Sequence, residues 1–152
     1  MIEWRDTMEI GVSAIDAEHR HLIEFANLVA RLPKGRSQRL ATMNLLSDLR
    51  ELFRQHFEQE EDLMFRVEYP KVDKHLLMHC TMMTQFDMCL QNSEHDSSVL
   101  DTLALVTDWI VNHIKTEDTS LASFIFQRRQ AVALAKAKTK PKAAPKQVAG
   151  KR

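Results

Sequence analysis

Apolar residues recur at spacings of three and four along four stretches of the chain, which is typical of helices with one buried face. The pattern predicts helices over about residues 13–32, 37–67, 70–92 and from 98 into the 120s. Pro33 and Gly35 end the first stretch, and Pro70 suits the first turn of the third. A polar turn at 92–97 precedes the fourth stretch. With such short connections we predict an all-α, antiparallel up-down-up-down four-helix bundle, preceded by an N-terminal arm.

These apolar stripes contain histidines and carboxylates at positions where core residues are expected. The stripes are Ile15, His19, Leu22, Ala26 and Val29; Leu45, Leu49, Leu52, His56, Glu60 and Leu63; Val72, His75, His79, Met82 and Phe86; and Leu103, Val106, Ile110 and His113. Burying unpaired polar or charged groups is strongly unfavourable, so this set needs a compensating partner. One such histidine is more often a hydrogen-bonded core residue than a ligand. Histidines on all four stripes, together with the i, i+4 pairs His56/Glu60 and His75/His79, instead indicate a shared metal site.

Taken in order, these residues resemble the ligand pattern of the hemerythrin family. The pattern consists of His19 within Asp16-Ala17-Glu18-His19, His56-x3-Glu60, His75-x3-His79 and His113-x4-Asp118. The resemblance spans roughly residues 4 to 126 and includes Trp4, Gly11, Tyr69-Pro70 and Trp109 as flanking features. It implies two iron ions, as Fe2+ or Fe3+, bridged by an oxo or hydroxo group and by two carboxylates.

The resemblance also implies how the ligands divide between the two irons. It assigns His75, His79 and His113 to one iron and His19 and His56 to the other, with Glu60 and Asp118 as bridges. The iron with two histidines then keeps one open position, where O2 would bind. By resemblance, four residues line this O2 pocket: Leu22, Phe57, Trp109 and Ile110.

The second bridging carboxylate involves a choice between neighbouring residues. Glu117 lies four residues after His113 and fits regular helix geometry, whereas Asp118 lies five after it and is rotated by about 140°. The family pattern has aspartate at the fifth position. A π-bulge would return Asp118 to the face of His113, and such bulges often occur at functional sites. We therefore predict Asp118 as the ligand, with a departure from α geometry before it and Glu117 as the alternative.

Four further residues with metal-binding side chains are expected to have other roles. His21 follows His19 by two residues and should be exposed, and His95 should be solvated in a turn. Glu61 is expected at the surface or behind the ligands. Cys80 is expected to pack as a small apolar residue.

We predict a reversible O2 binder, for storage, delivery or sensing, rather than an enzyme. Histidine dominates the ligand set, whereas carboxylate-rich di-iron bundles resemble oxygen-activating enzymes and ferritins. The sequence also shows no second redox group or signalling domain. One alternative is a di-iron enzyme, a peroxidase, oxidase or nitric oxide reductase, that uses the same site. Another is an adaptor protein with a structural metal and a basic tail that makes the functional contact.

Composition divides the 152 residues into a bundle domain, 1–130, and a tail, 131–152. The tail is rich in Ala, Lys and Pro and contains seven of the 21 basic residues and no acidic one, which predicts disorder. We expect it to be solvated, with contact to a polyanion such as nucleic acid or an anionic membrane as the alternative. Cys80 and Cys89 fall on opposite faces of one predicted helix, so no disulfide is expected. Without a signal peptide or membrane span, we expect a cytoplasmic protein.

Overall fold

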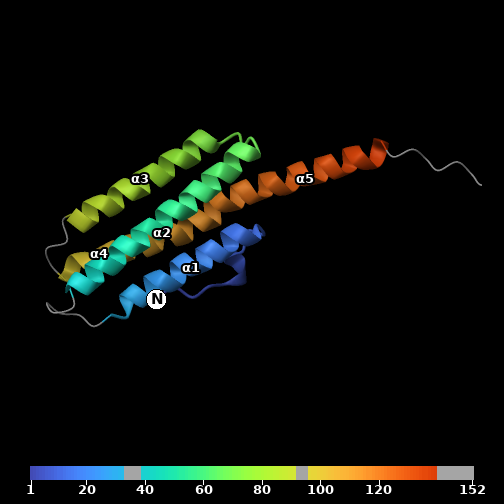
Figure 1. The fold of residues 1–152 in the computed structure, drawn as a ribbon. Coiled ribbons are helices and arrows are strands. Elements are labelled where there is room, and N and C mark those ends of the chain that lie inside the picture. Colours follow the sequence, from blue (N-terminus) through green and yellow to red (C-terminus); the bar gives the residue numbers. More distant parts are fainter. Residues whose placement is uncertain (33–38, 92–95, 140–152) are drawn as a thin grey trace, which may run out of the picture.

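The computed structural model describes residues 1–32, 39–91 and 96–139, and every regular element in these ranges is helical (Figure 1). The elements are η1 (Asp6–Met8, 3-10), α1 (Ser13–Ala30), α2 (Arg39–Arg66), α3 (Val72–Gln91), α4 (Asp96–His113), η2 (Ile114–Asp118, π) and α5 (Thr119–Thr139). Because η2 joins α4 to α5 directly, these three elements form one continuous fourth rod of the bundle. The predicted all-α four-helix bundle is confirmed.

The observed helix ends differ from the predicted ones by a few residues. The third helix begins at Val72 rather than at Pro70, and the fourth begins at Asp96, two residues earlier than predicted. The predicted stop at Pro33 and Gly35 and the first residues of the turn at 92–97, including His95, lie outside the described residues. None of the described helices is both long and apolar enough to cross a membrane.

Helix α5 continues well past the position where the sequence predicted a disordered tail. Figure 1 shows α5, in orange and red, projecting beyond the ends of its neighbours. The helix reaches Thr139, although disorder was predicted from residue 131, because Ala, Leu and Lys are strong helix formers even without packing partners. The side chains of residues 126–138 are all exposed, so this part of α5 adds nothing to the core. Residues 140–152 of the predicted tail lie outside the described residues.

Two apolar clusters fill the bundle and leave a layer between them. The larger cluster includes Leu49, Phe53, Phe86 and Ile110, all at most 1% exposed. The smaller cluster consists of Met64 from α2, Tyr69 from the turn between α2 and α3, and Leu121 and Ile125 from α5, toward the opposite end of the bundle. Each such buried side chain stabilises the fold by roughly 1.5–3 kcal/mol. The polar residues of the stripes lie between these clusters, where apolar packing on both sides keeps water away.

The N-terminal arm is held against α1 by partly buried hydrogen bonds. The backbone N–H groups of Ile10 and Gly11 donate to the two carboxylate oxygens of Asp16, over 2.8 and 3.1 Å. Gly11 has a φ of 78°, a left-handed conformation that glycine adopts without strain. Nearer the terminus, Asn27 exchanges two hydrogen bonds with the backbone of Ile2. These contacts bring η1 against η2, the element that ends at Asp118.

Cys80 and Cys89 are both free, as expected. The prediction that Cys80 packs as a small apolar residue is wrong, because its side chain is exposed. It follows the inward-facing His79 by one residue, which turns its side chain away from the core.

Candidate metal centre

All seven predicted ligands meet in the layer between the apolar clusters, and none is more than 2% exposed. They are His19 from α1, His56 and Glu60 from α2, His75 and His79 from α3, His113 from the end of α4, and Asp118 from the end of η2. Except for Asp118, each position follows from its stripe, since residues three or four apart repeat on the face that a helix turns toward the core.

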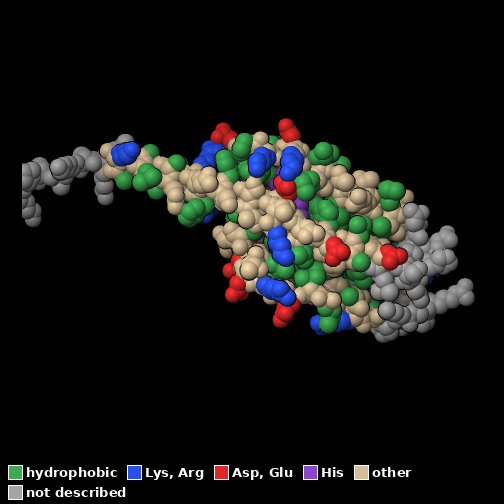
Figure 2. Space-filling view, turned by 180° about the vertical axis from the view of Figure 1, so that it is seen from behind, with side chains coloured by type: hydrophobic (Ala, Val, Ile, Leu, Met, Phe, Trp, Pro, Cys, Tyr) green, Lys and Arg blue, Asp and Glu red, His purple; other side chains and the backbone are tan. Residues whose placement is uncertain are grey.

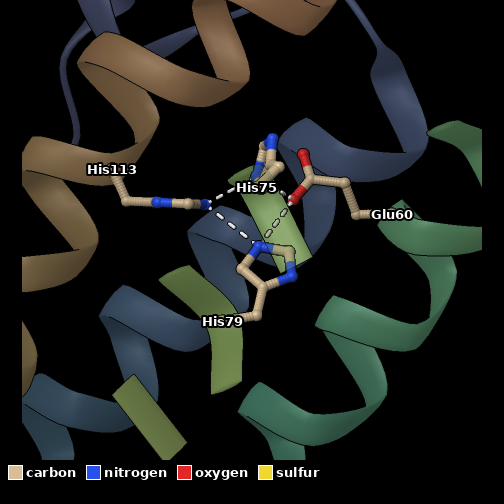
Figure 3. A group of neighbouring side chains, drawn as sticks. All are labelled: Glu60, His75, His79 and His113. Atoms are coloured by element: carbon tan, nitrogen blue, oxygen red, sulfur yellow. Dashed lines mark hydrogen bonds and ion pairs between the residues drawn. The ribbon is translucent and has the colours of Figure 1, made fainter. Parts of the chain in front are cut away.

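The seven side chains form two sets whose donor atoms lie within 4.8 Å of one another. One set is Glu60, His75, His79 and His113, shown in Figure 3. The other set is His19, His56 and Asp118. The structure therefore divides the histidines three and two, in the same sets that the family resemblance implied.

Within the three-histidine set, ring nitrogens face one another. The Nε2 atom of His113 lies 2.9 Å from that of His75 and 3.1 Å from that of His79, as the dashed lines in Figure 3 indicate. A neutral imidazole offers one N–H and one lone pair, so three converging nitrogens cannot all be satisfied by one another. A cation between them would accept a lone pair from each, which is the arrangement that a metal ion requires.

Asp118 connects the two sets. Its Oδ2 atom lies 3.1 Å from Nε2 of His19, in the two-histidine set. Its Oδ1 atom lies 3.0 Å from Nε2 of His113 and 3.3 Å from Nε2 of His75, in the three-histidine set. The two oxygens of one carboxylate thus face different sets, as a carboxylate that bridges two metal ions must.

The other carboxylate is also positioned for a cation. Oε2 of Glu60 lies 3.3 Å from Nε2 of both His75 and His79. Neither oxygen of Glu60 has a hydrogen-bond partner, and the same holds for both oxygens of Asp118 and for Nε2 of His56. Buried polar atoms without partners are rare because each is costly, and here they cluster at one point. The donor set therefore fits two adjacent metal ions.

Electrostatics keep both carboxylates ionised. Burial and the nearby Asp118 act to raise the pKa of Glu60, but the adjacent imidazoles of His75 and His79 outweigh them and lower it to about 2. Burial likewise opposes ionisation of Asp118, yet His113, His19 and His75 hold its pKa well below the usual value. For both carboxylates, the neighbouring histidines therefore outweigh burial and lower the pKa.

The pKa values of the two histidines of α3 are shifted in opposite directions. Burial lowers the pKa of His75, but the adjacent carboxylates of Asp118 and Glu60 outweigh it and raise the pKa to about 9. His79 has its pKa lowered, mainly by burial. Without a cation, the centre therefore holds a proton on His75 that a metal ion would have to displace.

The predicted departure from α geometry before Asp118 is confirmed, because Ile114–Asp118 forms a π-helix. The extra residue in this turn rotates Asp118 onto the face of His113, where it is fully buried. Thr119 stabilises the turn, since its backbone N–H and its side-chain hydroxyl both donate to the carbonyl of Ile114. Glu117, the alternative ligand, instead pairs with Nζ of Lys74 at 2.8 Å, outside the two sets.

Two carboxylates behind the ligands orient one histidine in each set. Oε2 of Glu18 lies 3.0 Å from Nδ1 of His56, and Oε1 of Glu61 lies 3.0 Å from Nδ1 of His79. Such contacts fix the ring with its other nitrogen toward the centre. Glu61 therefore lies behind the ligands, one of its two predicted positions. Sequence reasoning missed Glu18, because its partner is on another helix and its only local signal is its place beside His19.

The four residues expected to line an O2 pocket all lie in the large apolar cluster or pack against it. The ring of Phe57 stacks on His79 at a centroid distance of 3.9 Å, and Trp109 stacks on His113 at 4.2 Å. Leu22 and Ile110 are buried one helical turn from a predicted ligand. Leu22 also lines a cavity of about 180 Å3 between α1 and α2 that reaches His56. His21, expected to be exposed, is exposed.

Comparison with known proteins identifies the family of this chain. The sequence model of the hemerythrin HHE cation binding domain matches residues 10–125, which include all seven predicted ligands. The chain belongs to the hemerythrin family. Bacteriohemerythrin of Clostridium acetobutylicum is 31% identical over 124 residues, covering 78% of this chain and 96% of the relative.

Other hemerythrins show the same relationship at lower identity. Bacteriohemerythrin of Stenotrophomonas maltophilia is 28% identical over 125 residues, 80% of each chain. Myohemerythrin of Theromyzon tessulatum is 28% identical over 116 residues, covering 76% of this chain and 87% of the relative. The family match ends at residue 125, so the exposed part of α5 lies beyond it.

Proposed function

We propose that this hemerythrin binds O2 reversibly at a non-haem di-iron centre, for oxygen storage, delivery or sensing. The observation that carries the proposal is the division of five buried histidines into a set of three and a set of two, with Asp118 facing both. Unequal sets that share bridging groups leave one metal ion a ligand short, and that position is available to a small molecule.

The residues that would hold the irons follow from the two sets. His75, His79 and His113 would bind one iron and His19 and His56 the other, with Glu60 and Asp118 shared and an oxo or hydroxo group as the third bridge. When bound, the two irons supply the electrons and the open position for O2. Imidazole and carboxylate ligands suit iron but also accept zinc or manganese, so the metal must be measured.

The protein's own contribution is to orient the ligands and to restrict access to the centre. Glu18 and Glu61 hold two imidazoles in position, and Phe57 and Trp109 cover two rings with apolar surface. The cavity that reaches His56 has a volume of about 180 Å3, below the roughly 300–1,000 Å3 of pockets for organic ligands. A second cavity, of about 440 Å3, is lined by Phe57 and His79, on the three-histidine side, where the iron would have no open position. The smaller cavity, beside His56, is the one next to the position proposed for O2.

The proposal is tested by loading the protein with ferrous iron in the absence of O2 and titrating it with O2. We expect about two irons per chain from the ligand sets, and about one O2 bound per pair of irons. A single iron per chain would contradict the di-iron centre. Catalytic consumption of hydrogen peroxide or nitric oxide would support the alternative, a di-iron enzyme at the same site.

Residues 131–152 support a second, independent proposal, contact with a polyanion. This segment contains seven basic residues and no acidic one, and the side chains of Lys136 and Lys138, in its described part, are exposed. Binding to a polyanion through these residues should weaken steeply with added salt, because bound counterions are released on association.

A further inference from the structure

A groove with an apolar floor and cationic rims lies between the end of α2 and the exposed part of α5. Its volume is about 470 Å3, within the range of roughly 300–1,000 Å3 typical of sites for small organic ligands. The floor includes Leu63 from α2 and Ile125 and Val132 from α5. Four cationic residues line it, and no acidic one does: Arg66, Arg128, Arg129 and Lys136. Figure 2 shows basic side chains, in blue, along the projecting part of α5.

The arginines of the groove differ in how many hydrogen bonds and ion pairs they make with the rest of the protein. Arg128 is held by the backbone carbonyl of Val67 and by Glu68, whose Oε2 lies 2.7 Å from its Nη2. Arg66 donates from Nε to the carbonyl of Asp62 at 3.2 Å, which leaves the rest of its guanidinium for another acceptor. Arg129 makes no hydrogen bond or ion pair within the described part of the chain. The groove thus offers guanidinium donors suited to a carboxylate.

The periodicity of α5 gives the groove its shape. Ile125 and Val132 are seven residues apart and so lie on one face, as do Arg129 and Lys136. From residue 125 to 136 the helix rises by about 16 Å, so the apolar strip and its cationic edge run side by side over that length. A ligand that contacts both the apolar strip and the cationic edge needs an extended apolar chain and a negative charge.

Charge and shape exclude other occupants of the groove. Residues 140–152 contain only basic charges, so this segment is repelled by the rims, and so is α5 of a second copy. The other exposed apolar residues of α5, Phe126 and Leu134, lie away from the groove, which leaves no single apolar face to rest on a membrane. We propose that the groove binds one free, single-chain amphipathic carboxylate of the fatty-acid class.

The groove is connected to the metal centre by packing. Leu63 follows Glu60 by about one helical turn, and Ile125 follows Asp118 by about two. Ile125 also belongs to the smaller apolar cluster, whose members Met64 and Leu121 follow Glu60 and Asp118 by about one helical turn. Leu63 packs against that cluster. A ligand that binds only the folded state stabilises the protein against unfolding. Binding in the groove should therefore also raise the thermal midpoint of unfolding.

The experiment uses the full chain and laurate below its micellar concentration, followed by titration calorimetry at low salt. We expect saturable binding of about one laurate per chain. Dodecyl maltoside, which has the same chain without the charge, and butyrate, which has the charge without the chain, should bind at least about tenfold more weakly.

Matched variants on α5 locate the site. Val132→Glu places a charge on the floor and Arg129→Gln removes a rim charge, so each should weaken laurate binding by about tenfold or more. Leu134→Glu and Lys138→Gln are exposed changes on the same helix that do not line the groove, and should alter binding by less than about twofold. Since Val132 is 48% exposed, these variants should fold, which circular dichroism verifies.

Several results would overturn the proposal. One is the absence of saturable laurate binding, and another is an equal loss in Val132→Glu and Leu134→Glu, which would indicate non-specific apolar contact. Equal affinity for dodecyl maltoside would remove the role of the cationic rims. Binding only to vesicles that contain anionic phospholipid would identify a membrane surface instead.

Discussion

Asp118 and Glu117 are neighbours with opposite expected importance, and substituting each in turn tests the metal centre. Asp118 is fully buried and contacts three histidines at 3.0–3.3 Å. Removing one partner of a buried charge network typically destabilises a protein by about 3–5 kcal/mol, so Asp118→Ala should lower the free energy of unfolding by that amount. It also removes a bridging ligand, and iron occupancy should fall. Glu117 pairs with a Lys74 side chain that is 62% exposed, and surface pairs contribute only about 0–1 kcal/mol.

The assay is iron content per chain, together with unfolding by denaturant of the iron-loaded and metal-free forms. Asp118→Asn is the matched control, because it keeps the shape of the side chain and removes its charge. It should lose iron as Asp118→Ala does, while retaining more of the packing. If Glu117→Ala lost iron and Asp118→Ala did not, the π-helix would have no role in ligand placement and the two-set centre would be wrong.

Further predictions concern the residues behind the ligands, the pH dependence and the tail. Glu18→Ala and Glu61→Ala should each reduce iron affinity by about 10–100-fold, as for other residues that orient ligands, while Glu58→Ala, an exposed change on α2, should not. With its pKa raised to about 9, His75 stabilises the metal-free protein fully below about pH 6.5, and this contribution is lost as the pH rises through 9. Iron affinity, which requires the neutral ring, should rise over the same interval in a pH series of metal titrations. Deleting residues 131–152 should change the free energy of unfolding by less than about 0.5 kcal/mol and leave O2 binding unchanged, since residues 131–138 are exposed.

The stripes predicted most of the centre because helical periodicity determines which residues share a face. His19, His56 and His113 occupy core positions of their helices, and burial follows from that spacing. Asp118 could not be placed in this way, because regular geometry favours Glu117. The family resemblance was needed to predict the π-turn, and Thr119, which stabilises that turn, carries no pattern that a sequence alone would reveal.

Other features depend on contacts between helices or on competing tendencies of one segment. Glu18 contacts His56 across 38 residues, a pairing that the periodicity of either helix does not encode. Residues 131–152 contain few large apolar side chains, which predicted disorder, yet the Ala and Lys residues of 131–139 also favour helix, and the helix continues. The groove between α2 and α5 exists only because of this continuation, so it could not be predicted from the sequence.

The most direct test of the central claim is repeated oxygenation of the iron-loaded protein, followed by its visible absorption spectrum. The reduced protein is exposed to O2, returned to an O2-free atmosphere, and the cycle is repeated. We predict a spectral change on exposure that reverses on removal of O2 over successive cycles, with the iron content per chain unchanged. A single irreversible conversion to the ferric form would contradict reversible O2 binding.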